Sequence, residues 1–216
     1  PMVLIMVSLV FFIMRVLPGD PIRSQLGPRV SEEQADRIRE RLGLNDPIPV
    51  QYVNYLKDMV TLDFGNALTR GERPIKDELG ERLPATIELT IPAMLFTTIF
   101  GIGLGAFAAM NRKKFIDYAI RVFSVLIYSI PIFFMGLVFQ IIFGVRLDLL
   151  PLAGRMDPVI LTSFESVTNF YVLDSILTQD WGALKSSLLH LIMPSLTLGL
   201  ALTGVFIRLT RVNMIE

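Results

Sequence analysis

The sequence predicts an all-α, polytopic membrane protein, and long apolar stretches carry that prediction. Three stretches, at residues 89–110, 122–145 and 186–207, have about 20 or more residues without a formal charge, the length that crosses a hydrocarbon layer of roughly 30 Å. The composition agrees, because 52% hydrophobic residues and 15 Phe suit a surface that faces lipid. The expected fold class is therefore a transmembrane helical bundle.

A fourth apolar stretch opens the chain at residues 1–14, and its helix is expected over residues 1–17. At about 1.5 Å per residue such a helix covers only about 25 Å, which is less than the hydrocarbon layer. We therefore expect the remainder of a first transmembrane helix. A secretory signal peptide is disfavoured, because no small-residue cleavage site follows and Arg15 lies at the far end.

Helix signals recur in the long polar segment at residues 18–83. Ser31 and Gln34 form a capping box, and Gly43 stands where a left-handed cap ends a first short helix. Pro49 is expected to open a second helix. The inner faces are predicted to hold Ala35, Ile38 and Leu42 in the first helix, and Tyr52, Val53, Leu56 and Val60 in the second.

A third helix is expected from Pro74, with Ile75, Leu79 and Leu83 on one face, and Pro84 is expected to break the chain before the membrane. Two interpretations of the three helices stay open. They either cover the outer mouth of the bundle or contact a partner or solute, since amphipathic spacing indicates only that one face is buried.

The loops predict the orientation. Residues 111–117 form a short basic connection with Arg112, Lys113 and Lys114, and such loops stay in the cytoplasm. Residues 18–83 and 146–185 are then expected outside. The predicted spans are residues 1–17, 84–110, 118–145 and 186–207, with the end of the chain, residues 208–216, in the cytoplasm.

Small residues within the second span predict a helix contact. Gly101 and Gly105 are four residues apart, a spacing that lets two helix backbones approach closely in lipid. The surrounding Gly-x-Gly-x-Gly pattern does not indicate a nucleotide site, because no strand precedes it.

Polar groups and prolines in the third and fourth spans predict a solute path. Pro131 and Pro194 interrupt these helices, and Gln140 is the only amide of its span, so each needs a partner inside the bundle or water. Static kinks are the alternative interpretation. The predicted wall residues are Ser129, Pro131 and Gln140 on one side, and Pro194, Ser195 and Thr197 on the other.

Several kinds of chemistry find no support in the sequence. A net charge of zero gives no reason to expect nucleic acid. Cysteine is absent, and His190 is the only histidine, which favours an interfacial or hydrogen-bonded residue over a metal ligand or catalytic base. No catalytic or phosphate-binding motif occurs. We therefore expect no catalytic residue, metal site or bound cofactor in this chain.

Five motifs occur in order along the chain: RVLPGDP at residues 15–21, LGLNDPIPVQY at 42–52, DFG at 63–65, RLPATIEL at 82–89 and HLIMPSLTLG at 190–199. Together they resemble B-type permease subunits of dipeptide and oligopeptide ABC importers, which are binding-protein-dependent inner membrane components. The resemblance spans nearly the whole chain.

The resemblance implies an importer that works by alternating access. It implies a second permease, two ATPase subunits that hold ATP and Mg, and an extracytoplasmic solute-binding protein. About four of the family's six helices are present, and a coupling segment toward the ATPase begins with Arg208, Arg211, Asn213 and Glu216. Peptides are the leading solute, with nickel and oligosaccharides as further possibilities. A structural membrane subunit of an energy-transducing complex is the alternative function.

Overall fold

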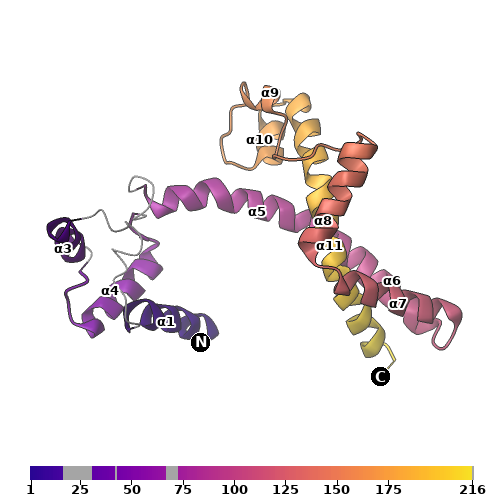
Figure 1. Cartoon of the computed structure of the whole chain (residues 1–216), viewed down its shortest axis with the longest axis horizontal. Coiled ribbons are helices and arrows are strands. Elements are labelled where there is room, and N and C mark those ends of the chain that lie inside the picture. The colour runs from indigo at the N-terminus through magenta and orange to yellow at the C-terminus, as the bar shows by residue number, and fades with distance from the viewer. Residues whose placement is uncertain (17–30, 42, 67–72, 216) are drawn as a thin grey trace. The chain divides into compact units, whose positions relative to one another are not determined.

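The computed structural model describes residues 1–16, 31–41, 43–66 and 73–215 (Figure 1). Within these residues the regular elements are helices, joined by turns and irregular connections, apart from an isolated bridge between Asn66 and Pro74. The all-α prediction is confirmed for this part of the chain. The structure divides into two units, Pro1–Gly80 and Glu81–Glu216, and each is described by itself.

The first unit contains α1 (Met2–Val16), α3 (Glu32–Arg41) and α4 (Ile48–Thr61). The predicted caps of α3 are confirmed. The Ser31 and Gln34 side chains each accept a hydrogen bond from the other residue's backbone N–H, at 3.3 Å. Gly43 takes a φ of +63°, a left-handed conformation that glycine adopts without steric penalty. Leu42 lies outside the described residues.

Aromatic packing sets which face of α4 is covered. The ring of Phe11 in α1 lies 5.2 Å from that of Tyr52 and 5.3 Å from that of Tyr55, measured between centroids. The predicted inner positions Val53 and Val60 are instead exposed, Val60 at 85%. That part of the prediction was wrong because the tyrosine rings, which bury more area than valine, orient α4 toward α1.

The second unit holds the apolar helices. They are α5 (Ile75–Thr97, in this unit from Glu81 on), η1 (Thr98–Ile102), α6 (Gly103–Met110), α7 (Phe115–Ser129), α8 (Ile132–Phe139), η2 (Gln140–Arg146), α9 (Pro158–Leu161), α10 (Tyr171–Leu177) and α11 (Trp181–Asn213). The labels η1 and η2 mark π-helical turns. Among the described residues, the helices Ile75–Met110 and Trp181–Asn213 are long and apolar enough to cross a membrane.

The prolines in these helices behave differently from one another. The prediction that Pro84 breaks the chain was wrong, because α5 continues through Pro84 and Pro92. Pro194 likewise lies inside the continuous helix α11 and does not interrupt it. A proline's φ fits a helix, and only one hydrogen bond per proline is lost. Pro131 does interrupt its helix, since α7 and α8 meet at 97° around it.

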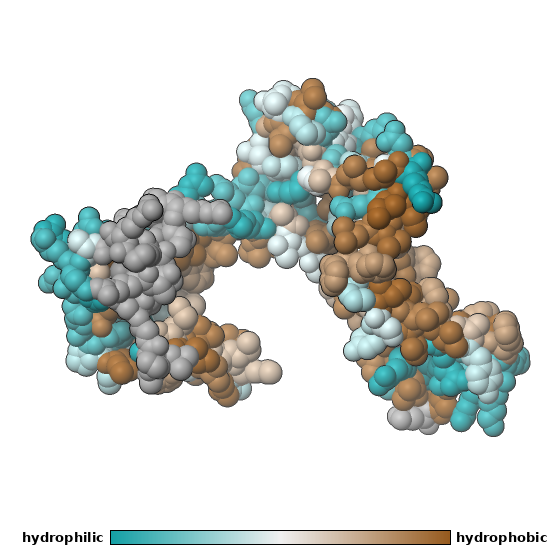
Figure 2. All heavy atoms as spheres, in the orientation of Figure 1, coloured by the Kyte–Doolittle hydropathy of each residue, from teal (hydrophilic) through white to brown (hydrophobic). Residues whose placement is uncertain are grey.

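Helix α11 is the centre of the second unit and packs against α6, α7, α8, α10 and η1 (Figure 1). Small and polar side chains, including Ala183, Ser187, Thr203 and Gly204, are buried on it. Large apolar side chains of α7 and α8 are exposed, among them Phe133 and Leu126. Figure 2 shows hydrophobic residues along these helices. This inside-out distribution suits a helix bundle in lipid.

Candidate functional site

The second unit contains an open-sided cavity of about 490 Å³ between α5, α8, η2, α11 and the chain that follows η2. Most of its lining is apolar, and its polar side chains come from Gln140, His190 and Thr197. The lining residues are Leu89, Ile132, Phe133, Gly136, Leu137, Gln140, Pro151, Leu152, Ala153, Gly154, His190, Met193, Pro194, Thr197 and Leu198. An apolar cavity with a few polar groups is typical of a small-molecule site.

Residues 151–157, here called the strap, form one wall of the cavity. The Gln140 amide donates a hydrogen bond of 2.8 Å to the carbonyl of Leu152. Near the other end of the strap, the backbone N–H of Asp157 donates to the Ser186 hydroxyl at 2.9 Å. Gly154 takes a φ of +91°, so the strap turns sharply beside His190. The strap is therefore fastened to η2 and α11.

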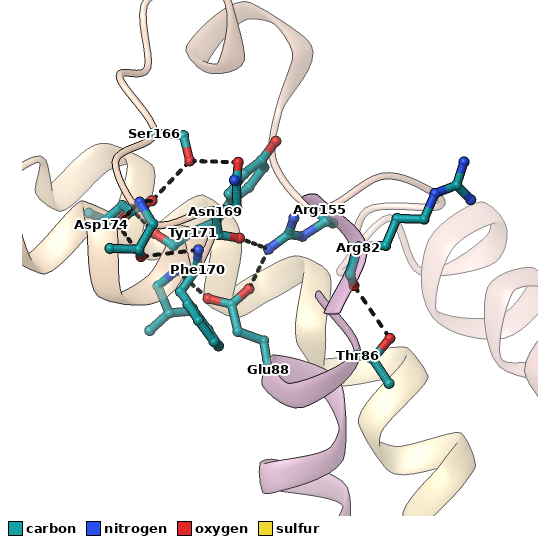
Figure 3. A network of polar contacts seen from close by, with 12 residues as sticks. Arg82, Thr86, Glu88, Arg155, Ser166, Asn169, Phe170, Tyr171 and Asp174 are labelled. Atoms are coloured by element: carbon teal, nitrogen blue, oxygen red, sulfur yellow. Dashed lines mark hydrogen bonds and ion pairs between the residues drawn. The ribbon is translucent and has the colours of Figure 1, made fainter. Parts of the chain in front are cut away.

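A polar network joins the strap to α5 (Figure 3). Glu88 of α5 accepts a hydrogen bond of 2.8 Å from Arg155 of the strap. The guanidinium of Arg155 also lies over the ring of Tyr171, 3.8 Å from its centroid, and donates to the Asn169 carbonyl. Asn169 takes a φ of +64°. This ion pair links residues 67 positions apart in sequence, and sequence reasoning missed it because no local pattern relates the two residues.

Asp174 organises the loop before α10. Its buried carboxylate accepts hydrogen bonds from the hydroxyls of Ser166 and Thr168 and from the backbone N–H groups of Val167 and Thr168. Burial by itself raises the pKa of Asp174, but these hydrogen bonds outweigh it and hold the pKa below its ordinary value. The loop therefore stays ordered by a charged carboxylate at neutral pH.

His190 has a larger place in the site than the sequence indicated. Its Nδ1 lies 2.8 Å from the Ser186 carbonyl oxygen, and its ring lies on the cavity wall beside Gly154. The sequence favoured an interfacial or hydrogen-bonded histidine, and the hydrogen bond is present. Its position on the cavity wall was not predicted, because it depends on how α11 packs against the strap.

The structure brings together only part of the predicted path. Gln140, Pro194 and Thr197 line the cavity. Ser129 and Pro131 lie at the break between α7 and α8, and the Ser129 hydroxyl donates to the Val125 carbonyl. Ser195 is buried away from the cavity lining, and its hydroxyl has no hydrogen-bond partner within the described residues.

Gly101 and Gly105 lie directly against α11. A Cβ added to Gly101 would lie 2.6 Å from the Cβ of Phe206, and one added to Gly105 would lie 2.7 Å from that of Thr210. Real Cβ contacts are not that short. The helix that carries Gly101 and Gly105 can therefore lie this close to α11 only because neither residue has a side chain.

The predicted coupling residues differ in their surroundings: one is held in an ion pair and two are exposed. Arg211 forms a two-pronged ion pair with Asp117 of α7, at 2.6 Å (Nε to Oδ1) and 2.8 Å (Nη2 to Oδ2). Arg208 and Asn213 are exposed. Glu216 lies outside the described residues. Across the described ranges, no group of three or more His, Cys, Asp or Glu residues could hold a metal ion.

The family follows from comparison with known proteins. The family model of the binding-protein-dependent transport system inner membrane component matches residues 101–216, and the model of its N-terminal region matches residues 1–90. This chain belongs to that family. An inner membrane component with several apolar helices accords with the candidate spans seen in the structure.

Relatives of this inner membrane component carry names of peptide transport. It is 37% identical to a dipeptide transport system permease protein DppB of Alkalihalophilus pseudofirmus, over 100% of this chain and 64% of the relative. It is 36% identical to the probable D,D-dipeptide permease DdpB of Escherichia coli (95% and 60%) and 35% identical to the di/tripeptide permease DppB of Pseudomonas aeruginosa (96% and 61%). The chain thus spans about three fifths of the length of these relatives.

Proposed function

We propose that the chain is the permease subunit of a peptide ABC importer and that the cavity is part of its solute path. The observation that carries this proposal is a mostly apolar, open-sided cavity with three polar side chains, lined by apolar helices of a transport family. The relatives' names support peptides as the solute. They give no support to the alternative, a structural subunit of an energy-transducing complex.

The chain acts together with partners that supply recognition and energy. A solute-binding protein delivers the peptide, a second permease completes the path, and two ATPase subunits bind ATP and Mg. The family description supports the binding protein, since it names binding-protein-dependent transport. The exposed Arg208 and Asn213 at the end of α11 are suited to approach an ATPase, whereas Arg211 is held by Asp117.

Gln140 gives the sharpest test of this path. Gln140→Leu removes the amide that lines the cavity and also holds the Leu152 carbonyl. We expect peptide uptake by reconstituted transporter to fall several-fold, since a typical hydrogen bond contributes roughly 0.5–1.5 kcal/mol. Assembly and basal ATP hydrolysis should change little.

A matched control is Gln179→Leu, which changes an amide outside the cavity lining. Uptake should then match that of the unmodified transporter. Equal uptake kinetics for Gln140→Leu and Gln179→Leu would place the solute path on other faces of the bundle.

The orientation is tested by thiol labelling. We propose that residues 18–83 and 146–185 lie outside and residues 111–117 inside the cell, because the basic Arg112, Lys113 and Lys114 favour the cytoplasm. In intact cells, the thiol introduced by Lys113→Cys should resist an impermeant reagent, whereas that introduced by Glu33→Cys should react. The opposite labelling pattern would contradict this orientation.

A further inference from the structure

The ion pair between Glu88 and Arg155 is partly buried. The Oε2 atom of Glu88 lies 2.8 Å from Nη2 of Arg155, and the side chains of Glu88 and Arg155 are 9% and 29% exposed. When Arg155 moves away, the mostly buried Glu88 carboxylate loses its charged partner, which is unfavourable. The pair should therefore be either fully formed or fully broken. The contact is thus suited to two discrete states.

Glu88 fastens two segments to α5 at once. While one carboxylate oxygen binds Arg155, the other accepts a hydrogen bond of 2.7 Å from the backbone N–H of Val172, in the first turn of α10. Arg155 in turn binds the carbonyl of Asn169. The three interactions meet at one place (Figure 3). Movement of the strap away from α5 must therefore break a charged contact.

The chain neighbours of both charges line the cavity. Leu89 follows Glu88 on α5, and Gly154 precedes Arg155 in the strap. A rotation of α5 or a displacement of the strap that separates the pair therefore also moves the cavity wall.

We propose that the Glu88–Arg155 pair is a latch that holds the strap in place as a wall of the cavity, and that release of the strap widens the cavity. This inference rests on the proposed function, because it assigns regulation to the same cavity. Gln140 and Ser186 hold the strap by neutral hydrogen bonds to its backbone. The charged contact is the strongest of the three, since ionised hydrogen bonds are roughly twice as strong as neutral ones.

Thiol accessibility in the complete transporter tests the latch. Residues 1–216 contain no cysteine, so Leu198→Cys places a new thiol on the cavity wall, and Val159→Cys places one on the exposed surface of α9. Each is combined with Glu88→Gln, with Arg155→Gln, or with Glu165→Gln as a control at an exposed carboxylate of the same connection. The probe is an impermeant methanethiosulfonate, applied without binding protein or ATP, and labelling of this subunit is followed by mass spectrometry.

We expect Glu88→Gln and Arg155→Gln to raise the labelling rate at position 198 by about tenfold, because loss of a hydrogen bond between charged groups shifts a two-state equilibrium by about that factor. Glu165→Gln should leave this rate unchanged. The rate at position 159 should be the same in every variant, since that site is exposed in both states.

Two results would overturn the latch. One is an unchanged rate at position 198 in both variants. The other is a parallel rise at positions 198 and 159, which would mean that the pair only maintains the fold of the connection.

Peptide uptake by the unmodified transporter separates this inference from the proposed function. Absence of uptake together with a selective rise at position 198 contradicts the peptide function and leaves the latch in place. Uptake without any rise contradicts the latch alone.

Discussion

Gly105→Leu is expected to reduce the amount of intact protein in the membrane several-fold. A Cβ at this position would meet the Thr210 Cβ at 2.7 Å and the Ile207 carbonyl oxygen at 2.9 Å, so part of the obstruction is backbone that cannot rotate away. Overpacking of this kind destabilises by about 1–3 kcal/mol or more. A loss of that size changes protein abundance several-fold. Gly101→Leu should act similarly against Phe206.

The same stretch offers a matched control. An added Cβ at Gly103 meets nothing within 4 Å, so Gly103→Leu makes the same chemical change on the open side of the helix. The measurement is the yield of monodisperse complex in detergent. Normal yield for Gly105→Leu, or equal losses for the two variants, would contradict a close contact between α6 and α11.

The second large effect is expected at the ion pair between Asp117 and Arg211. Asp117 has a side-chain exposure of 2%, and the guanidinium holds both of its oxygens while the Lys113 backbone N–H donates a third hydrogen bond. Arg211→Met leaves this carboxylate without its main partner. We expect a loss of about 3–5 kcal/mol, the usual consequence of breaking a buried pair. The measurement is the half-life of the complex on heating in detergent.

Arg121→Met is the control for this pair. Arg121 approaches the same carboxylate only to 3.6 Å and is 44% exposed, so its contribution should be about 0–1 kcal/mol. The double variant Asp117→Asn with Arg211→Met should be more stable than Arg211→Met alone, because no buried charge is then left unpaired. Equal half-lives for Arg121→Met and Arg211→Met would contradict this account.

Features that depend on segment length or on residues close together in sequence could be predicted. Helices are the way in which a single long apolar segment pairs its own backbone groups in lipid, so the fold class followed from the length of those segments. The caps of α3 depend on residues three to twelve positions apart, from Ser31 to Gly43, and were predicted correctly. Pro131 marked a true interruption, because α7 ends at Ser129.

Features that depend on long-range packing could not be predicted. Nothing local distinguishes Pro131, which breaks a helix, from Pro84 and Pro194, which lie inside continuous helices. The two central ion pairs join residues 67 and 94 positions apart. Judged from their neighbours in sequence, Arg155 and Arg211 could each have been a solvated surface charge. The cavity likewise needs α5, α8, η2, α11 and the strap together, so of its lining residues only Gln140, Pro194 and Thr197 were predicted.

The continuous path of α5 and α11 through their prolines changes the hydrogen-bonding character of the cavity. Pro92 and Pro194 have no N–H, so the carbonyl groups of Glu88 and His190, four residues earlier, lose their helical donors. His190 lines the cavity, and Glu88 precedes the lining residue Leu89. At and beside the cavity lining, two backbone carbonyl groups are therefore left without a donor from their own helix.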